Sequence, residues 1–150
     1  MTETEDLNTI LQSYQYVIPP FQRDYSWQTE HVVDFWNDAS DSIKENNDNY
    51  YFGPMILVKT NHSSTFKVVD GQQRITTLSI LLSVIRDIAT QTGNGEVRAN
   101  TMVYLMNSLK RVKIPSLKLN DNNDAYYRDF ILKDDDPEKK IKLKTSNQYE

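Results

Sequence analysis

Five consecutive residues, Asp70 to Arg74 (Asp-Gly-Gln-Gln-Arg), carry the clearest signal for chemistry in this chain. They stand between a strand-like run, Thr65 to Val69, and an apolar helical run that opens at Ile75. A tight turn that leads into a helix presents free backbone N–H groups, and an arginine beside them suits a phosphate. The pentapeptide therefore predicts an anion site at a helix N-terminus.

A capping box is the structural interpretation of the same residues. Asp70 as the N-cap would accept from the Gln73 amide, while the Gln73 side chain would return to the N-cap amide, a device that contributes about 1 kcal/mol. Gly71 and Arg74 fit this less well. Glycine inside a helix costs about 1 kcal/mol relative to alanine, and the macrodipole disfavours positive charge in the first turn. A bound anion would explain both residues, so the two interpretations stand side by side.

A second arginine, Arg23, lies among the aromatic residues Phe21, Tyr25 and Trp27. In one interpretation it rests on an aromatic platform, an interaction worth about 0.5–1 kcal/mol when exposed. In the other, Arg23 is a second phosphate ligand and Tyr25 or Trp27 stacks a base. The spacing of these residues does not decide between the two.

Composition limits the class of protein. The chain has 150 residues, of which 38% are hydrophobic and 25% charged, as expected for one soluble domain. It lacks cysteine, and its two histidines, His31 and His62, lie far apart and are expected at the surface, so no metal site is predicted. No apolar run reaches the roughly 18 residues of a membrane span, and the N-terminus lacks a signal-peptide pattern. We therefore expect a cytoplasmic protein without a membrane contact.

Charge is distributed unevenly, with an acidic first third and two basic clusters later in the chain. The clusters are Lys110, Arg111, Lys113 and Lys118, and then Lys139, Lys140, Lys142 and Lys144. A domain with a pI near 5.2 lacks the broad basic face of an autonomous DNA-binding protein. We interpret both clusters as solvated surface.

Hydrophobic periodicity predicts the elements that must position these residues. Helices are expected over residues 7–14, from Ser26 or Thr29 as a cap to about 45, from Ile75 to about 92, over 96–109 and over 121–132. Strands are expected at 16–18, at 50–60 with an interruption at Gly53-Pro54, at 65–69 and at 114–119, with 55–59 and 66–69 forming a hairpin. Two helices have a predicted apolar face, made of Val32, Trp36, Ala39 and Ile43 in one and of Ile75, Leu78, Leu81, Leu82, Ile85 and Ile88 in the other.

Three segments resemble the N-terminal domain of the GmrSD-type, modification-dependent restriction endonucleases. They are residues 18–27 (IPPFQRDYSW), 51–58 (YFGPMILV) and 68–78 (VVDGQQRITTL), in the family's order and rough spacing. Gly53-Pro54 replaces the more usual glycine followed by a small residue. The resemblance covers most of residues 7–90 and continues weakly through 117–119 and the helix near Phe130.

This resemblance implies a ParB/sulfiredoxin-like α+β fold, with a small mixed sheet and a hairpin packed against several helices. It implies one domain over residues 1–150, helical from about residue 96, that binds and hydrolyses a nucleotide in defence against modified or phage DNA. The ending looks like a boundary inside a longer protein. A C-terminal nuclease domain of the His-Asn-His type is expected outside this chain, so DNA would be a partner of the full-length protein.

The family's motif residues fall on Asp70, Gly71, Gln72, Gln73 and Arg74, with Arg23 as a second contributor. As a hypothesis, Gly71 and the amides after it cradle phosphate, and the two arginines balance charge on the β and γ groups. Gln72 or Gln73 would orient a water, and Asp70 would hold the loop or a divalent metal. The expected cofactor is a nucleoside triphosphate, with Mg²⁺ inferred from triphosphate chemistry.

Two other functions stay open at this point. One is a DNA-binding specificity module of ParB-like fold, in which the pentapeptide grips backbone phosphate without hydrolysis. The other is a structural interaction domain in which the pentapeptide is only a helix cap.

Overall fold

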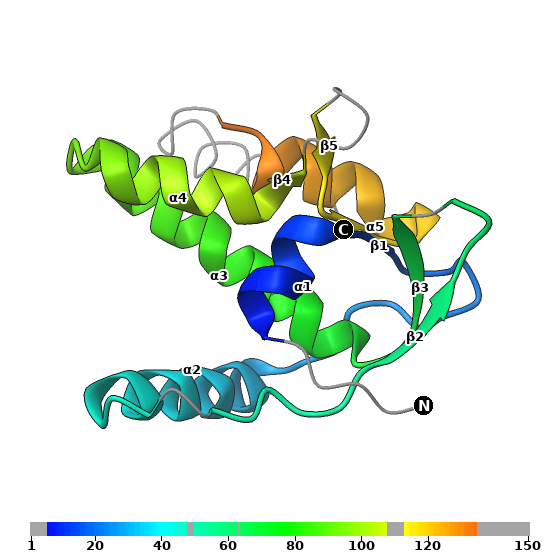
Figure 1. The fold of residues 1–150 in the computed structure, drawn as a ribbon, viewed down its shortest axis with the longest axis horizontal. Helices are drawn as coiled ribbons and strands as arrows, with labels where there is room; N and C mark the ends of the chain where they lie inside the picture. The colour runs from blue at the N-terminus through cyan, green and yellow to red at the C-terminus, as the bar shows by residue number, and fades with distance from the viewer. Residues whose placement is uncertain (1–5, 48–49, 63, 108–112, 135–150) are drawn as a thin grey trace.

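The computed structural model of the chain describes residues 6–47, 50–62, 64–107 and 113–134. Its elements, in chain order, are α1 (Leu7–Ser13), β1 (Gln15–Val17), α2 (Thr29–Lys44), β2 (Ile56–Lys59), β3 (Thr65–Asp70), α3 (Gln72–Gln91), α4 (Gly95–Leu105), β4 (Met106–Asn107), β5 (Ile114–Pro115), β6 (Leu117–Lys118), α5 (Asp121–Tyr126) and the π-helix η2 (Tyr127–Leu132). Figure 1 shows α3 crossing the middle of the molecule, with α4 packed along it and the sheet near its N-terminal end.

A four-stranded mixed sheet in the order β2-β3-β1-β6 frames the fold. β1 is parallel to both neighbours, so that Tyr16 lies opposite Phe66 of β3 and Leu117 of β6. β2 and β3 form an antiparallel pair with an irregularity between Ile56 and Leu57. The predicted α+β class and the predicted hairpin are therefore confirmed.

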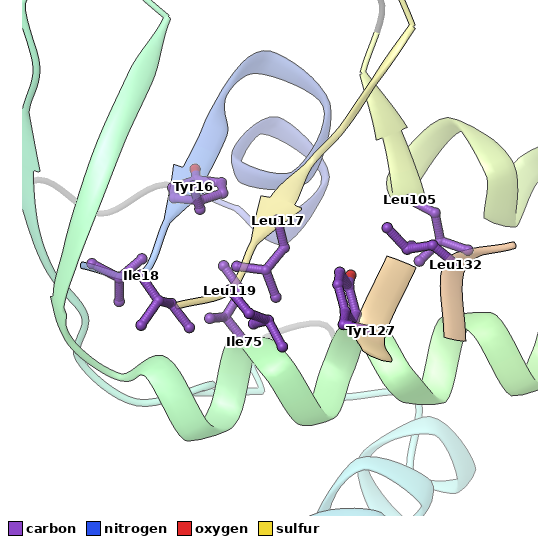
Figure 2. Packing of buried hydrophobic residues seen from close by; sticks show 9 residues of the cluster. Tyr16, Ile18, Ile75, Leu105, Leu117, Leu119, Tyr127 and Leu132 are labelled. Carbon is purple, nitrogen blue, oxygen red and sulfur yellow. The ribbon is translucent and has the colours of Figure 1, made fainter. Parts of the chain in front are cut away.

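The hydrophobic core lies between one face of this sheet and the helices (Figure 2). The sheet side contributes Tyr16, Ile18, Val68, Leu117 and Leu119, and the helices contribute Ile75, Leu105, Tyr127 and Leu132. Because side chains alternate between the two faces of a strand, the residues beside these, such as Val69 and Lys118, are exposed.

The predicted apolar face of α3 is wrong in one respect. Ile88 is 53% exposed, whereas Ser79, Ser83 and Arg86 are buried. The reason is that η2 packs against this side of α3 and brings polar groups with it. The Tyr127 hydroxyl hydrogen-bonds the Ser79 hydroxyl, and burial raises the pKa of Tyr127, which keeps the phenol neutral. Partners for polar groups, rather than apolar area alone, decide which face of α3 is buried.

Glycine ends α3 as predicted. Gly93 has φ +71°, in the left-handed region, and the amides of Gly93 and Asn94 donate to the carbonyls of Thr90 and Ala89 at 3.3 and 2.8 Å. This pair of bonds is a Schellman motif, which satisfies carbonyls that a helix end leaves free. Asn94 then caps α4 by accepting from the Val97 amide at 3.2 Å.

Several predicted boundaries are wrong. The chain from residue 50 to 55 is not a strand, because Gly53 has φ +95° and Pro54 cannot donate to a ladder. The predicted strand at 114–119 is two short strands in different sheets. The helix predicted over 121–132 has the correct bounds, and within them α5 is followed directly by the π-helix η2. The helix predicted to reach residue 109 ends at Leu105, and β4 begins at Met106.

The start and the buried face of α2 also differ from the prediction. Neither Ser26 nor Thr29 is the cap, because Gln28 occupies the N-cap and its amide donates to His31 Nδ1 at 3.1 Å. Phe35 is the buried residue of α2, while the predicted core residues Val32, Trp36 and Ile43 are exposed. Phe35 packs against Trp27 and Phe52, with ring centroids 6.0 and 5.9 Å apart.

Some predictions fall outside the described residues. These are Lys110, Arg111 and the cluster from Lys139 to Lys144, whereas Lys113 and Lys118 are described and exposed. His31 and His62 are exposed, as expected. None of the described helices has the length and apolar character that crossing a membrane requires.

Candidate functional site

The turn between β3 and α3 leaves a helix N-terminus without a side-chain cap. Asp70 is the last residue of β3, where it pairs with Ile56, and Gly71 is the N-cap with φ +88°. The first helical bond runs from the Ile75 amide to the Gly71 carbonyl at 3.2 Å. The predicted capping box is therefore wrong, because the left-handed glycine keeps Asp70 in the strand. In the described structure, the amides of residues 72–74 have no hydrogen-bond partner.

Gly71 itself is explained by the backbone. A left-handed φ favours glycine, and a Cβ at this position would lie 2.7 Å from Met55 Cγ. The glycine is thus needed for the turn and for Met55 to pack on it. Its presence does not by itself indicate an anion, whereas the free amides that follow it do.

The residues that carry these amides line an open cleft of about 530 Å³. It is lined by Gln22, Arg23, Trp27, Val69 and residues 70–74. Most of the predicted site residues are therefore brought together, although Arg23 and Trp27 lie more than 40 positions before the pentapeptide. A cleft of this size suits a ligand of nucleotide dimensions.

Gln72 and Gln73 hold the segment that carries Arg23. Gln73 Oε1 accepts from the Ser26 amide at 2.9 Å and Gln73 Nε2 donates to the Asp24 carbonyl at 3.2 Å. Gln72 Nε2 donates to the Arg23 carbonyl at 3.3 Å, while Gln72 Oε1 is buried and has no partner within the described residues. Both side chains are buried, and their hydrogen bonds hold residues 23–26 at the wall of the cleft.

Tyr25 stands apart from the other predicted residues. Its hydroxyl hydrogen-bonds Thr77 Oγ1 at 2.9 Å, and its ring lines a small neighbouring cavity with Ile18 and Leu119 rather than the open cleft. Trp27 does line the cleft and stacks on His31, with ring centroids 6.1 Å apart. Of the two aromatic candidates, Trp27 is placed to contact a ligand and Tyr25 is placed to anchor its segment on α3.

The two arginines of the cleft differ in how they are held. Arg23 is exposed, and its guanidinium contacts no partner in the part of the chain that the structure describes. Arg74 Nη2 donates to the Pro54 carbonyl at 2.6 Å, and its guanidinium covers Gly53, where an added Cβ would overlap Arg74 Nη1. The segment Gly53-Pro54 therefore holds the Arg74 guanidinium in place.

Gly53→Ala is expected to displace Arg74 and to destabilise the fold by about 1–2 kcal/mol, because alanine at φ +95° is strained. Thermal unfolding measures the loss of stability. The matched control is Gly95→Ala. Its added Cβ meets no atom within 4 Å, so this variant is not expected to have a lower melting temperature. Equal melting temperatures for the two variants would contradict the left-handed conformation of Gly53.

Several residues that build the site were missed from the sequence. Asp24 Oδ1 accepts from Asn120 Nδ2 and Asn123 Nδ2, both at 2.8 Å. These contacts join positions 96 and 99 residues apart. The only signal for them is the weak resemblance at residues 117–119 and near Phe130, which lies on either side of Asn120 and Asn123 without including them.

The cleft combines positive donors with one carboxylate. Asp70 is exposed, and its carboxylate hydrogen-bonds no group among the residues described. Three amides and two guanidinium groups attract an anion, and an acidic oxygen beside them suits a divalent cation carried by that anion. No group of three or more metal-ligating side chains occurs in the described ranges.

Comparison with known proteins decides the family. The model of the family described as "GmrSD restriction endonuclease, N-terminal domain" matches residues 7–150. The chain belongs to this family. The resemblance of the three sequence segments is thereby confirmed, and this GmrSD N-terminal domain serves a restriction system that defends against phage DNA. Among curated proteins, no match to the chain was found.

Proposed function

We propose that this GmrSD N-terminal domain binds and hydrolyses a nucleoside triphosphate, and so regulates the restriction system to which it belongs. The observation that carries the proposal is the uncapped N-terminus of α3, whose three free amides belong to residues that line an open cleft together with Arg23. A helix N-terminus attracts phosphate through these amides and its dipole. The nuclease activity and the contact with DNA belong, in this proposal, to the full-length protein.

The two arginines suit a chain of phosphates. The guanidinium of Arg23 is free to bind, and Arg74 keeps further N–H donors after one of them is used by Pro54. Charge-assisted hydrogen bonds of this kind are worth about 1.5–3 kcal/mol each. Trp27 at the cleft offers a surface for the base, since stacking on an aromatic side chain contributes about 1–3 kcal/mol.

Asp70 and Gln72 are the residues that we assign to hydrolysis. One carboxylate together with phosphate oxygens is a common way to hold Mg²⁺, so Asp70 fits this ion. When bound, Mg²⁺ would neutralise charge on the phosphates. Both ends of the Gln73 amide are bound to residues 24–26, whereas Gln72 Oε1 is buried and has no partner within the described residues. Gln73 therefore positions the segment, and Gln72 orients the water once its side chain turns Oε1 toward the cleft.

Calorimetric titration of the chain with ATP and GTP, each with Mg²⁺, and with a short DNA duplex separates this proposal from the other two functions. Nucleotide binding that Arg74→Ala removes supports the proposal. Duplex binding without nucleotide binding would instead identify a DNA-binding module. No binding of either ligand would leave the pentapeptide as a structural turn.

Asp70→Asn is expected to leave the melting temperature almost unchanged while it strongly reduces Mg²⁺-dependent phosphate release. Substitutions of exposed residues without partners usually change stability by less than about 0.5 kcal/mol. Differential scanning fluorimetry and a phosphate-release assay measure the two effects. The control Asp34→Asn removes an exposed carboxylate of α2, away from the cleft, and should change neither. A large fall in melting temperature with Asp70→Asn would show a structural role instead.

A further inference from the structure

The backbone around Arg23 is held by side chains from two distant elements. Asn120 Nδ2 donates to the Gln22 carbonyl at 3.3 Å and to Asp24 Oδ1 at 2.8 Å, and Asn123 Nδ2 donates to the same carboxylate oxygen at 2.8 Å. From the other side, Gln72 and Gln73 of α3 bind the carbonyls of Arg23 and Asp24. The residues before and after Arg23 are thus fixed, while its guanidinium has no partner in the described structure.

Asn120 is placed where its side chain would ordinarily cap a helix. It is the N-cap of α5, and an asparagine there usually accepts a hydrogen bond from an amide of the first turn, a contact that stabilises the helix. Here the side chain makes no such bond. It is 5% exposed, it donates to the Arg23 segment, and its Oδ1 accepts from Asn123 Nδ2 at 2.8 Å. The local capping contact is replaced by a long-range one.

We propose that Asp24, Asn120 and Asn123 form a latch that positions Arg23 for the phosphates of the nucleotide. This inference rests on the proposed function. Asn120 and Asn123 are positioning residues, which act through the backbone of residues 22–24 and touch no ligand. A side chain whose backbone is fixed in advance loses less conformational freedom when it binds, so the latch raises affinity without a contact of its own.

The latch also makes the region after β6 part of the nucleotide site. α5 and its N-cap bring Asn120 and Asn123 to the segment at positions 22–24, next to the open cleft. A change in the packing of α5 would therefore alter the position of Arg23 through the two hydrogen bonds of 2.8 Å to Asp24, without any contact to the ligand.

A double-mutant cycle with ATP and GTP, each with Mg²⁺, tests the latch. Asn120→Ser keeps a good N-cap residue, but the shorter serine side chain cannot reach Asp24. The variant is expected to weaken nucleotide binding roughly 5- to 50-fold, because residues in one hydrogen-bond network act together. In an Arg23→Ala background, Asn120→Ser should have no further effect, because it acts through Arg23. Asn122→Ala is the matched control, since Asn122 is an exposed asparagine in the same helical turn without a partner in the described ranges.

Additive losses from Asn120→Ser and Arg23→Ala, or an equal loss from Asn122→Ala, would overturn the latch. Asn123→Ala gives a second test that does not touch the N-cap, should Asn120→Ser fold poorly. If the wild-type chain binds neither nucleotide, the proposed function fails and the role of the latch in binding fails with it.

Hydrogen exchange measured without nucleotide distinguishes these failures. Asn120→Ser is expected to speed amide exchange in residues 22–26, including the Ser26 amide that Gln73 holds. Unchanged exchange in this segment would show that Asn120 does not hold it, whatever the outcome of the nucleotide titration. Faster exchange with unchanged affinity in a chain that binds nucleotide would overturn the positioning role alone.

Discussion

Arg23→Ala is expected to weaken nucleoside triphosphate binding by about 10- to 150-fold, with almost no change in stability. The affinity loss corresponds to about 1.5–3 kcal/mol for the charge-assisted hydrogen bonds of one guanidinium. Stability is unaffected because the Arg23 guanidinium has no partner in the described part of the chain. Isothermal titration calorimetry with ATP and GTP, each with Mg²⁺, measures the affinity, and thermal unfolding measures the stability.

Arg74 provides the comparison that makes this result specific. Arg74→Ala is expected to weaken binding to a similar extent, but it also removes the bond to the Pro54 carbonyl and exposes Gly53, so its melting temperature should fall. Arg128→Ala is the control for loss of positive charge, since Arg128 is exposed and lies 3.9 Å from the Asp124 carboxylate. Arg23→Ala with unchanged affinity would contradict the placement of phosphate in this cleft.

The sequence predicts those parts of the site that depend on short, continuous segments, namely the turn at residues 70–74 and the aromatic segment around Arg23. Alternating strand residues before Asp70 and helical periodicity after Ile75 place a turn between them, and the turn does lead into the N-terminus of α3. Their residue types within one aromatic segment predict Arg23 and Trp27 as site residues. Both line the same cleft as the pentapeptide.

The capping box at this turn was mispredicted although its residue types were right. Asp70 and Gln73 have the spacing of such a box, but the spacing does not predict the φ of Gly71. This angle decides where the helix begins. Once Gly71 takes the N-cap in the left-handed region, Asp70 stays paired in β3 and Gln73 turns to residues 24–26. One backbone angle therefore changes the role of two side chains.

Contacts over long sequence distances were beyond a single sequence for a different reason. The bond between Asn120 and Asp24 and the bond between Arg74 and the Pro54 carbonyl join segments that share no periodicity. Asparagine, aspartate and proline are also ordinary loop residues, so their types do not mark them as partners. The three-dimensional fold alone brings them together.

The buried arginine of α3, Arg86, is the most consequential example, because arginine side chains are mostly exposed in proteins. It is fully buried, and it donates from Nη1 to the Leu132 carbonyl at 2.7 Å and from Nη2 to the Ile131 carbonyl at 3.0 Å and the Lys133 carbonyl at 3.4 Å. Its Nε donates to Asp87 Oδ1 at 2.9 Å. Arg86 thus satisfies carbonyls that the end of η2 leaves free, with a cation at the negative end of that helix.

Arg86→Ala is expected to destabilise the domain by about 3–5 kcal/mol, the range for breaking a buried ion pair by removing one partner. For a chain of this length, such a loss lowers the melting temperature by roughly 6–20 °C. The substitution removes the Arg86 donor from the carbonyls of η2 and from the Asp87 carboxylate, and it leaves a cavity beside Leu132. Thermal and denaturant unfolding measure the effect.

Arg98→Ala is the control, because Arg98 likewise forms an ion pair, with Asp134, but its side chain is 41% exposed, so its loss should cost no more than about 1 kcal/mol. Arg86→Lys keeps the positive charge, but the lysine ammonium cannot reach several carbonyls at once. Its loss of stability should therefore lie between those of Arg86→Ala and Arg98→Ala. Because η2 follows directly on α5, loosening the end of η2 should also speed amide exchange near Asn120. An Arg86→Ala variant as stable as Arg98→Ala would show that the η2 carbonyls find other partners and that burial of Arg86 is not what holds η2 on α3.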